Sequence, residues 1–287
     1  MNWKLLIKIA LTSLALYWVY RQVNLKDIGQ YIFKAPAAIT LASVLLYNVA
    51  KLLGAYRLNL FFKQESILIS TKDNLKLYYI GMFYNLFLPG GVGGDGYKGY
   101  CIHESFDVSL KKVFKPILWD RVSGAVAILF LSMFIALFFP EITGETIWML
   151  IVIGCVLLYP CFWIATAFIV SRYKKIFVAT TAWALSIQTL QGIVTVLLLV
   201  GMGVSFDDLG KYLFIYFVST LATTLPITLG AIGIREVIFI EAAKIGLVDQ
   251  NTAVAFSLLF FAVGAISSLP GAFIRVDLSR PALEPNS

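Results

Sequence analysis

Residues 88–98 read Leu-Pro-Gly-Gly-Val-Gly-Gly-Asp-Gly-Tyr-Lys, and residues 225–235 read Leu-Pro-Ile-Thr-Leu-Gly-Ala-Ile-Gly-Ile-Arg. In both stretches glycines follow the proline at plus four and plus seven, and a cation follows it at plus nine. Pro89 and Pro226 are 137 residues apart, close to half of the 287-residue chain. One helix-breaking, positively charged element in each half is typical of transporters built from duplicated halves.

The composition is that of a polytopic membrane protein. Hydrophobic residues make up 60% of the chain, charged residues only 14%, and the mean hydropathy is +0.85, which leaves too little polar surface to coat a soluble globule. The two motifs interrupt apolar stretches at 75–109 and 212–246. Windows of about 20 residues predict continuous spans at 5–20 (an uncleaved helix), 37–57, 116–139, 147–170, 178–202 and 251–275.

The charges predict an orientation in the membrane. If each interrupted stretch is a re-entrant hairpin, sixteen lysines and arginines fall on or near one side and five on the other. The positive-inside rule then places both termini in the cytoplasm, and the expected location is the inner, cytoplasmic membrane.

The chain divides into two halves, residues 1–139 and 140–276. Adding 137 to the span boundaries predicted in the first half gives positions close to the boundaries predicted in the second half. We therefore expect an all-α polytopic membrane protein with one transmembrane domain over residues 1–287. Each half would contain two spans, a re-entrant hairpin broken by glycine and proline, and a third span. Because the first half crosses the membrane three times, the repeat is inverted, and residues 277–287 form a flexible cytoplasmic tail.

The first motif has the composition of an anion receptor. Its proline and glycines are not expected to continue a helix, so backbone N–H and C=O groups would be left without helical hydrogen bonds at membrane depth. Only protein or a water-filled cavity can satisfy such groups there. Open N–H groups beside a lysine attract anions. The alternative is that the glycines only permit close helix packing. The candidate binding residues of this motif are Asn85, Pro89, Gly90, Gly91, Gly93, Gly94, Asp95 and Lys98.

The second motif is more apolar. A charge near the bilayer centre costs about 2.5–3.5 kcal/mol, so Arg235 needs a partner, a cavity or a ligand. Glu236 or Glu241 could neutralise it in a structural ion pair; otherwise Arg235 and Lys98 would converge near the middle of the membrane. The candidate binding residues here are Pro226, Gly230, Gly233, Arg235 and Glu236.

Two further polar groups lie outside the two motifs. Asp120 and Arg121 lie at the cytoplasmic end of the 116–139 span and are candidate binding residues, although Arg121 could equally be a positive-inside anchor. His103, the single histidine, is expected to be solvated. The sequence shows neither a metal-ligand spacing nor a nucleophile–base pair, so an enzyme is disfavoured and no cofactor is expected. The net charge of +7 is concentrated in short loops, which argues against nucleic acid.

At these residues the chain resembles the transmembrane-region family of lysylphosphatidylglycerol synthases, which includes stand-alone flippase-like proteins. The resemblance rests on residues 85–98, the Asp120–Arg121 pair and residues 225–236, and it covers nearly the whole chain. It implies movement of a lipid between leaflets, with the glycine-rich hairpins handling the head group. One departure is Lys98, where an arginine is expected; a lysine offers a point charge instead of a bidentate fork.

The bifunctional members of that family also carry a soluble aminoacyl-transferase domain. Because this chain ends about a dozen residues after its last predicted span, that domain and lipid aminoacylation are not expected here.

The leading hypothesis is a lipid flippase or transporter for a lipid with an anionic phosphate head group. The head group would pass through a central cavity lined by the two motifs, whose alternating exposure follows from an inverted repeat. Two alternatives stay open: an accessory protein that presents a polyprenyl-phosphate or phospholipid to a transferase, and a membrane-embedded transferase. The expected partner is a membrane lipid, with a lipid-modifying enzyme and a second copy of the chain as further candidates.

Overall fold

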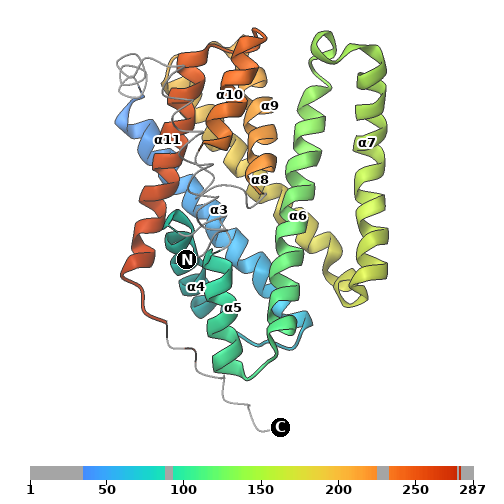
Figure 1. Cartoon of the computed structure of the whole chain (residues 1–287), viewed down its shortest axis with the longest axis vertical. Helices are drawn as coiled ribbons and strands as arrows, with labels where there is room; N and C mark the ends of the chain where they lie inside the picture. Colours follow the sequence, from blue (N-terminus) through green and yellow to red (C-terminus); the bar gives the residue numbers. More distant parts are fainter. Residues whose placement is uncertain (1–34, 88–92, 225–232, 277, 279–287) are drawn as a thin grey trace, which may run out of the picture.

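A computed structural model of the protein describes residues 35–87, 93–224, 233–276 and 278. Within these ranges the secondary structure is helical (Figure 1). The helices are α3 (Ala37–Gln64), α4 (Thr71–Phe87), α5 (Gly93–Phe106), α6 (Leu110–Ala136), α7 (Pro140–Ile169), η1 (Ser171–Ile176), α8 (Phe177–Gly201), α9 (Phe206–Thr223), α10 (Ile234–Lys244), α11 (Gln250–Ser268) and η2 (Leu269–Ala272).

Five of the described helical segments are long and apolar enough to cross a membrane. They confirm five predicted spans and the all-helical class; the predicted span at 5–20 lies outside the described residues, as does nearly all of the predicted tail. α6 begins before the predicted boundary at 116, because Oγ of Ser109 accepts a hydrogen bond from the backbone N–H of Lys112 (3.4 Å) and caps the helix. The five segments are Ala37–Gln64, Leu110–Ala136, Gly144–Ile169, Ser171–Gly201 and Gln250–Ala272.

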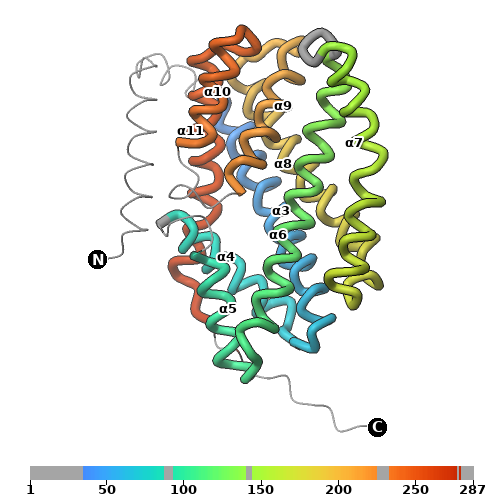
Figure 2. The backbone as a smooth tube through the Cα atoms, turned by 45° about the vertical axis from the view of Figure 1, so that its right-hand side comes forward, coloured from blue at the N-terminus to red at the C-terminus, as the bar shows by residue number. Residues whose placement is uncertain are grey.

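Each interrupted stretch contains two separate helices. α4 ends at Phe87 and α5 begins at Gly93, whereas α9 ends at Thr223 and α10 begins at Ile234; residues 88–92 and 225–232 are outside the described part of the chain. α4 packs on α5, and α9 packs on α10. In both views the α4–α5 pair lies in the lower half of the molecule and the α9–α10 pair in the upper half (Figures 1 and 2).

The two largest apolar cores of the described residues hold these helices together. The larger one joins α8, α9, α10 and α11 and is rich in aromatic side chains, among which Tyr216, Phe239 and Phe256 are fully buried. The smaller one joins α3 to α4, α5 and α6 through residues such as Leu58 and Leu77. The helices that flank the first motif are therefore anchored in the smaller core, and those that flank the second motif are anchored in the larger core. α3 contacts both cores.

Candidate functional site

Asp95 is the centre of an ion-pair group at the start of α5. Its Oδ1 atom lies 2.7 Å from Nζ of Lys98, one turn along the helix, and its Oδ2 atom pairs with Nε of Arg121 on α6. The ammonium group of Lys98 also lies 4.7 Å from the centre of the Tyr78 ring. One carboxylate therefore serves two cations, and the first motif is connected to the Asp120–Arg121 pair through Arg121.

The glycines of the first motif bring α4 and α5 into close contact. A Cβ atom added to Gly94 would lie 1.9 Å from the carbonyl oxygen of Gly81, so only glycine fits there. The backbone N–H of Gly94 donates to Oδ1 of Asn85 (2.8 Å). At Gly96, by contrast, an added Cβ would meet nothing within 4 Å. Close helix packing therefore explains the glycine at position 94, but it does not explain the glycine at position 96.

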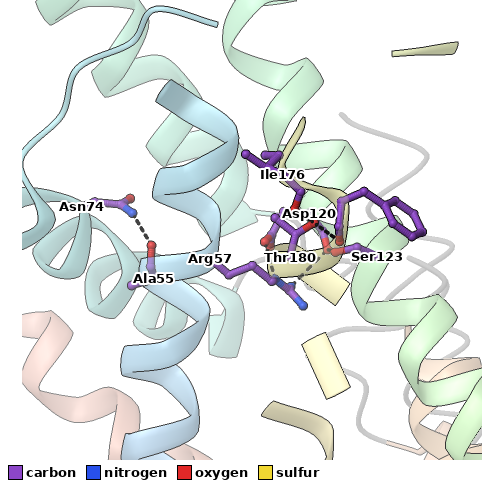
Figure 3. Close-up of polar contacts among 8 residues, drawn as sticks. Ala55, Arg57, Asn74, Asp120, Ser123, Ile176 and Thr180 are labelled. Atoms are coloured by element: carbon purple, nitrogen blue, oxygen red, sulfur yellow. Dashed lines mark hydrogen bonds and ion pairs between the residues drawn. The ribbon is translucent and has the colours of Figure 1, made fainter. Parts of the chain in front are cut away.

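Asp120 of α6 forms an ion pair with Arg57 of α3. Nε of Arg57 donates to Oδ1 of Asp120 (2.7 Å), and Nη2 donates to the Asp120 carbonyl oxygen (3.1 Å) (Figure 3). α3 continues to Gln64, beyond the predicted end of the span at residue 57, and Arg57 is only 6% exposed. A buried pair of this kind joins α3 to α6 and is costly to break.

Glu236 of the second motif caps the N-terminus of α10. The carboxylate accepts hydrogen bonds from the backbone N–H of Gly233 (2.7 Å) and from Oγ of Ser257 on α11 (2.6 Å). Glu241 pairs with Lys244. The structural ion pair considered for Arg235 is therefore wrong for both acids, because a glutamate in the first turn of a helix is within reach of its own N-terminal N–H groups.

Arg235 instead packs against aromatic rings. Its Cζ atom lies 4.8 Å from the centre of the Phe260 ring and 5.8 Å from that of Tyr216. Its Nε atom is buried and has no hydrogen-bond partner among the described residues. Among the described residues, the side chain is thus held by cation–π contacts and not by a carboxylate.

A cavity of about 220 Å³ lies between α3, α4, α10 and α11. Arg235 lines it together with Lys51, which stands halfway along α3 with its ammonium group 4.4 Å from the centre of the Tyr47 ring. Asn85 also lines the cavity and connects it to the start of α5 through Gly94. No carboxylate is among the described lining residues, and the sequences of residues 88–92 and 225–232 contain no acid.

The structure places the predicted site residues in different parts of the molecule. Asn85, Arg235 and the newly found Lys51 line the cavity, whereas Lys98 is in the Asp95 group and does not line it. His103 contacts the carbonyl oxygen of Val108 through Nδ1 (2.6 Å). The expectation that the glycines of the first motif cannot continue a helix is wrong for Gly93, Gly94 and Gly96, which form the start of α5, where Asn85 accepts the Gly94 N–H. The predicted residues Pro89, Gly90, Gly91, Pro226 and Gly230 lie outside the described residues.

The comparison with known protein families decides what this chain is. The sequence profile of the lysylphosphatidylglycerol synthase TM region matches residues 5–271. The chain belongs to this family. It is also 25% identical over 166 residues to a UPF0104 membrane protein of Pyrococcus horikoshii. That match covers 57% of the chain and 48% of the relative, so the chain spans about half the length of the curated relative.

Membership of the lysylphosphatidylglycerol synthase TM-region family agrees with the resemblance drawn from the two motifs. The matched residues include both motifs, the Arg57–Asp120 pair and both cations of the cavity. This member of the family is an integral membrane protein with five candidate spans in its described part.

Proposed function

We propose that the protein moves a lipid with an anionic phosphate head group between the two leaflets of the membrane, and that it is a transporter and not an enzyme. The observation that carries the proposal is the cavity lined by Lys51 and Arg235 without a carboxylate among its described lining residues. A cation inside a membrane protein needs a charged partner or water. An anionic ligand would provide that partner to both cations at once.

The magnitudes favour a ligand over aromatic stabilisation alone. A cation near the bilayer centre costs about 2.5–3.5 kcal/mol on insertion scales. A cation–π contact returns about 0.5–2 kcal/mol, and each of the two side chains stacks on aromatic rings in this way. The remaining deficit is what a phosphate would offset, because charge-assisted hydrogen bonds to its oxygens are roughly twice as strong as neutral ones.

The finer architecture belongs to the same proposal. We infer that α4–α5 and α9–α10 are re-entrant hairpins that enter from opposite sides in an inverted repeat, with both termini cytoplasmic in the inner membrane. Two observations support this: the pairs occupy opposite halves of the molecule (Figures 1 and 2), and the ends of α4 and α10 nearest to the interruptions line one cavity through Leu86 and Arg235. Alternating access to that cavity would carry the head group across.

Reconstitution in vesicles tests the function. The wild-type protein and protein-free vesicles receive a fluorescent phosphatidylglycerol or phosphatidylcholine, and an impermeant reductant then removes the signal from the outer leaflet. The proposal expects the protein to expose the inner-leaflet pool of the anionic probe faster than that of the zwitterionic probe. Retention of bound anionic lipid without faster exposure would indicate the accessory role instead, and chemical modification of the probe would indicate a transferase.

A further inference from the structure

A second concave surface, of about 610 Å³, lies between the start of α5 and the first half of α6, apart from the central cavity. Its apolar lining includes Phe114 and Leu118, which are 38% and 61% exposed. Lys111, Lys115 and Arg121 also line it. Lysine stems are apolar along most of their length, so the groove combines an apolar lining with three cationic groups.

The helical period arranges these residues in one stripe. Positions 111, 114, 115, 118 and 121 recur at the spacing of a single helix face. At 1.5 Å per residue, Lys111 and Arg121 are about 15 Å apart along the axis of α6. The groove therefore follows α6 from its start to the ion-pair group of the first motif, and cations stand at three levels along it.

The groove has an excess of positive charge. The residues that line it contribute three cations and a single carboxylate, Asp95, which is shared with Lys98. Lys115 is already held by Glu65 (3.0 Å). Lys111 is exposed and makes no ion pair with a described residue. Arg121 is held by Asp95, so Lys111 is the cation of the groove beside which an anion would balance a charge that no described carboxylate pairs with.

We propose that this groove is a lateral binding site for an anionic phospholipid, with one acyl chain against Phe114 and Leu118 and the phosphate beside Lys111. The amphipathic lining matches a molecule with an apolar chain and an anionic head, and basic residues near a membrane surface favour anionic lipids. The proposal concerns binding and goes beyond the central cavity; it holds whether or not the bound lipid is afterwards moved.

The chain offers a matched pair of variants. Lys111→Glu reverses a charge that lines the groove, whereas Lys112→Glu makes the same change at the next residue, which does not line it. Both variants and the wild type are placed in phosphatidylcholine nanodiscs containing a trace of phosphatidylglycerol with a photoreactive acyl chain. After irradiation, the labelled residues are mapped by mass spectrometry.

The expected result is labelling at Phe114 and Leu118 that falls at least about fivefold in Lys111→Glu and stays within about twofold of wild type in Lys112→Glu. Wild-type labelling should also decrease with added salt, which provides a readout that needs no variant. Equal losses in both variants, or equal labelling by a phosphatidylcholine probe, would overturn the proposal and leave ordinary lipid contact. Translocation measured on the same proteins reports on the central cavity separately, so failure of one claim is distinguishable from failure of the other.

Discussion

The contact between α4 and α5 predicts opposite outcomes for two nearly adjacent glycines. In Gly94→Ala the new methyl group would lie 1.9 Å from the carbonyl oxygen of Gly81 and 2.5 Å from its C and Cα atoms. Comfortable contacts are about 3.5 Å, so the two helices would have to separate by about 1.5 Å. Backbone atoms cannot rotate away as a side chain can. Overpacking of this kind costs about 1–3 kcal/mol, and the shift would also strain the Asn85–Gly94 hydrogen bond.

Gly96→Ala is the matched control, because an added Cβ there meets nothing within 4 Å. Alanine is favoured over glycine within a helix by up to about 1 kcal/mol, so this variant should be as stable as the wild type or slightly more stable. Equilibrium unfolding in mixed detergent micelles, followed by tryptophan fluorescence, measures both free energies of unfolding. If Gly94→Ala is as stable as Gly96→Ala, the close approach of α4 and α5 is wrong.

Three further predictions concern other parts of the molecule. Asp120→Ala should lower the free energy of unfolding by about 3–5 kcal/mol by leaving Arg57 buried and unpaired, and replacing both residues by leucine should recover much of the loss in the same unfolding assay. Ser257→Ala should cost about 1.5–3 kcal/mol, because it removes a hydrogen bond to the buried Glu236 carboxylate; an unchanged unfolding curve would argue against that contact. Lipids that co-purify with the protein should be enriched in anionic species by mass spectrometry, and the enrichment should decrease in Lys51→Ala to the share bound in the groove between α5 and α6, whereas Lys244→Ala at the exposed end of α10 should keep the full enrichment.

The spans and the two interruptions could be predicted because they depend on local properties. Long apolar runs need only a window of sequence, and a proline followed by several glycines ends a helix wherever it stands. The end of α4 at Phe87 and the start of α10 at Ile234 follow from this. Family membership was accessible for the same reason, since the motifs that indicate it are short and contiguous.

The partners of the charged residues could not be predicted from the sequence. Arg57 and Asp120 are 63 positions apart, and only the packing of α3 on α6 brings them together. Glu236 and Glu241 both lie close enough in sequence to neutralise Arg235. Glu236, however, caps its own helix, Glu241 pairs with Lys244, and Arg235 packs against aromatic rings.

The cavity lined by Lys51 and Arg235 could not be predicted from the sequence, because it is formed by the packing of four helices. Lys51 carried a signal, because an isolated lysine inside an apolar span indicates a functional position. Its proximity to Arg235, however, follows only from the arrangement of α3, α10 and α11 around the cavity. The sequence motif predicted Lys98 as the cation that converges with Arg235. In the structure, Lys51 lines the cavity with Arg235, and Lys98 does not.

The most direct test of the central claim is the rate at which anionic lipid crosses the membrane in vesicles containing wild type, Lys51→Ala/Arg235→Ala or Lys244→Ala. Hydrogen bonds between charged groups contribute about 1.5–3 kcal/mol each, so we predict that the double variant is at least about tenfold slower than wild type. Lys244→Ala should match wild type, because that cation does not line the cavity. If the folded double variant translocates the lipid at the wild-type rate, the cavity between Lys51 and Arg235 is not the path of the head group.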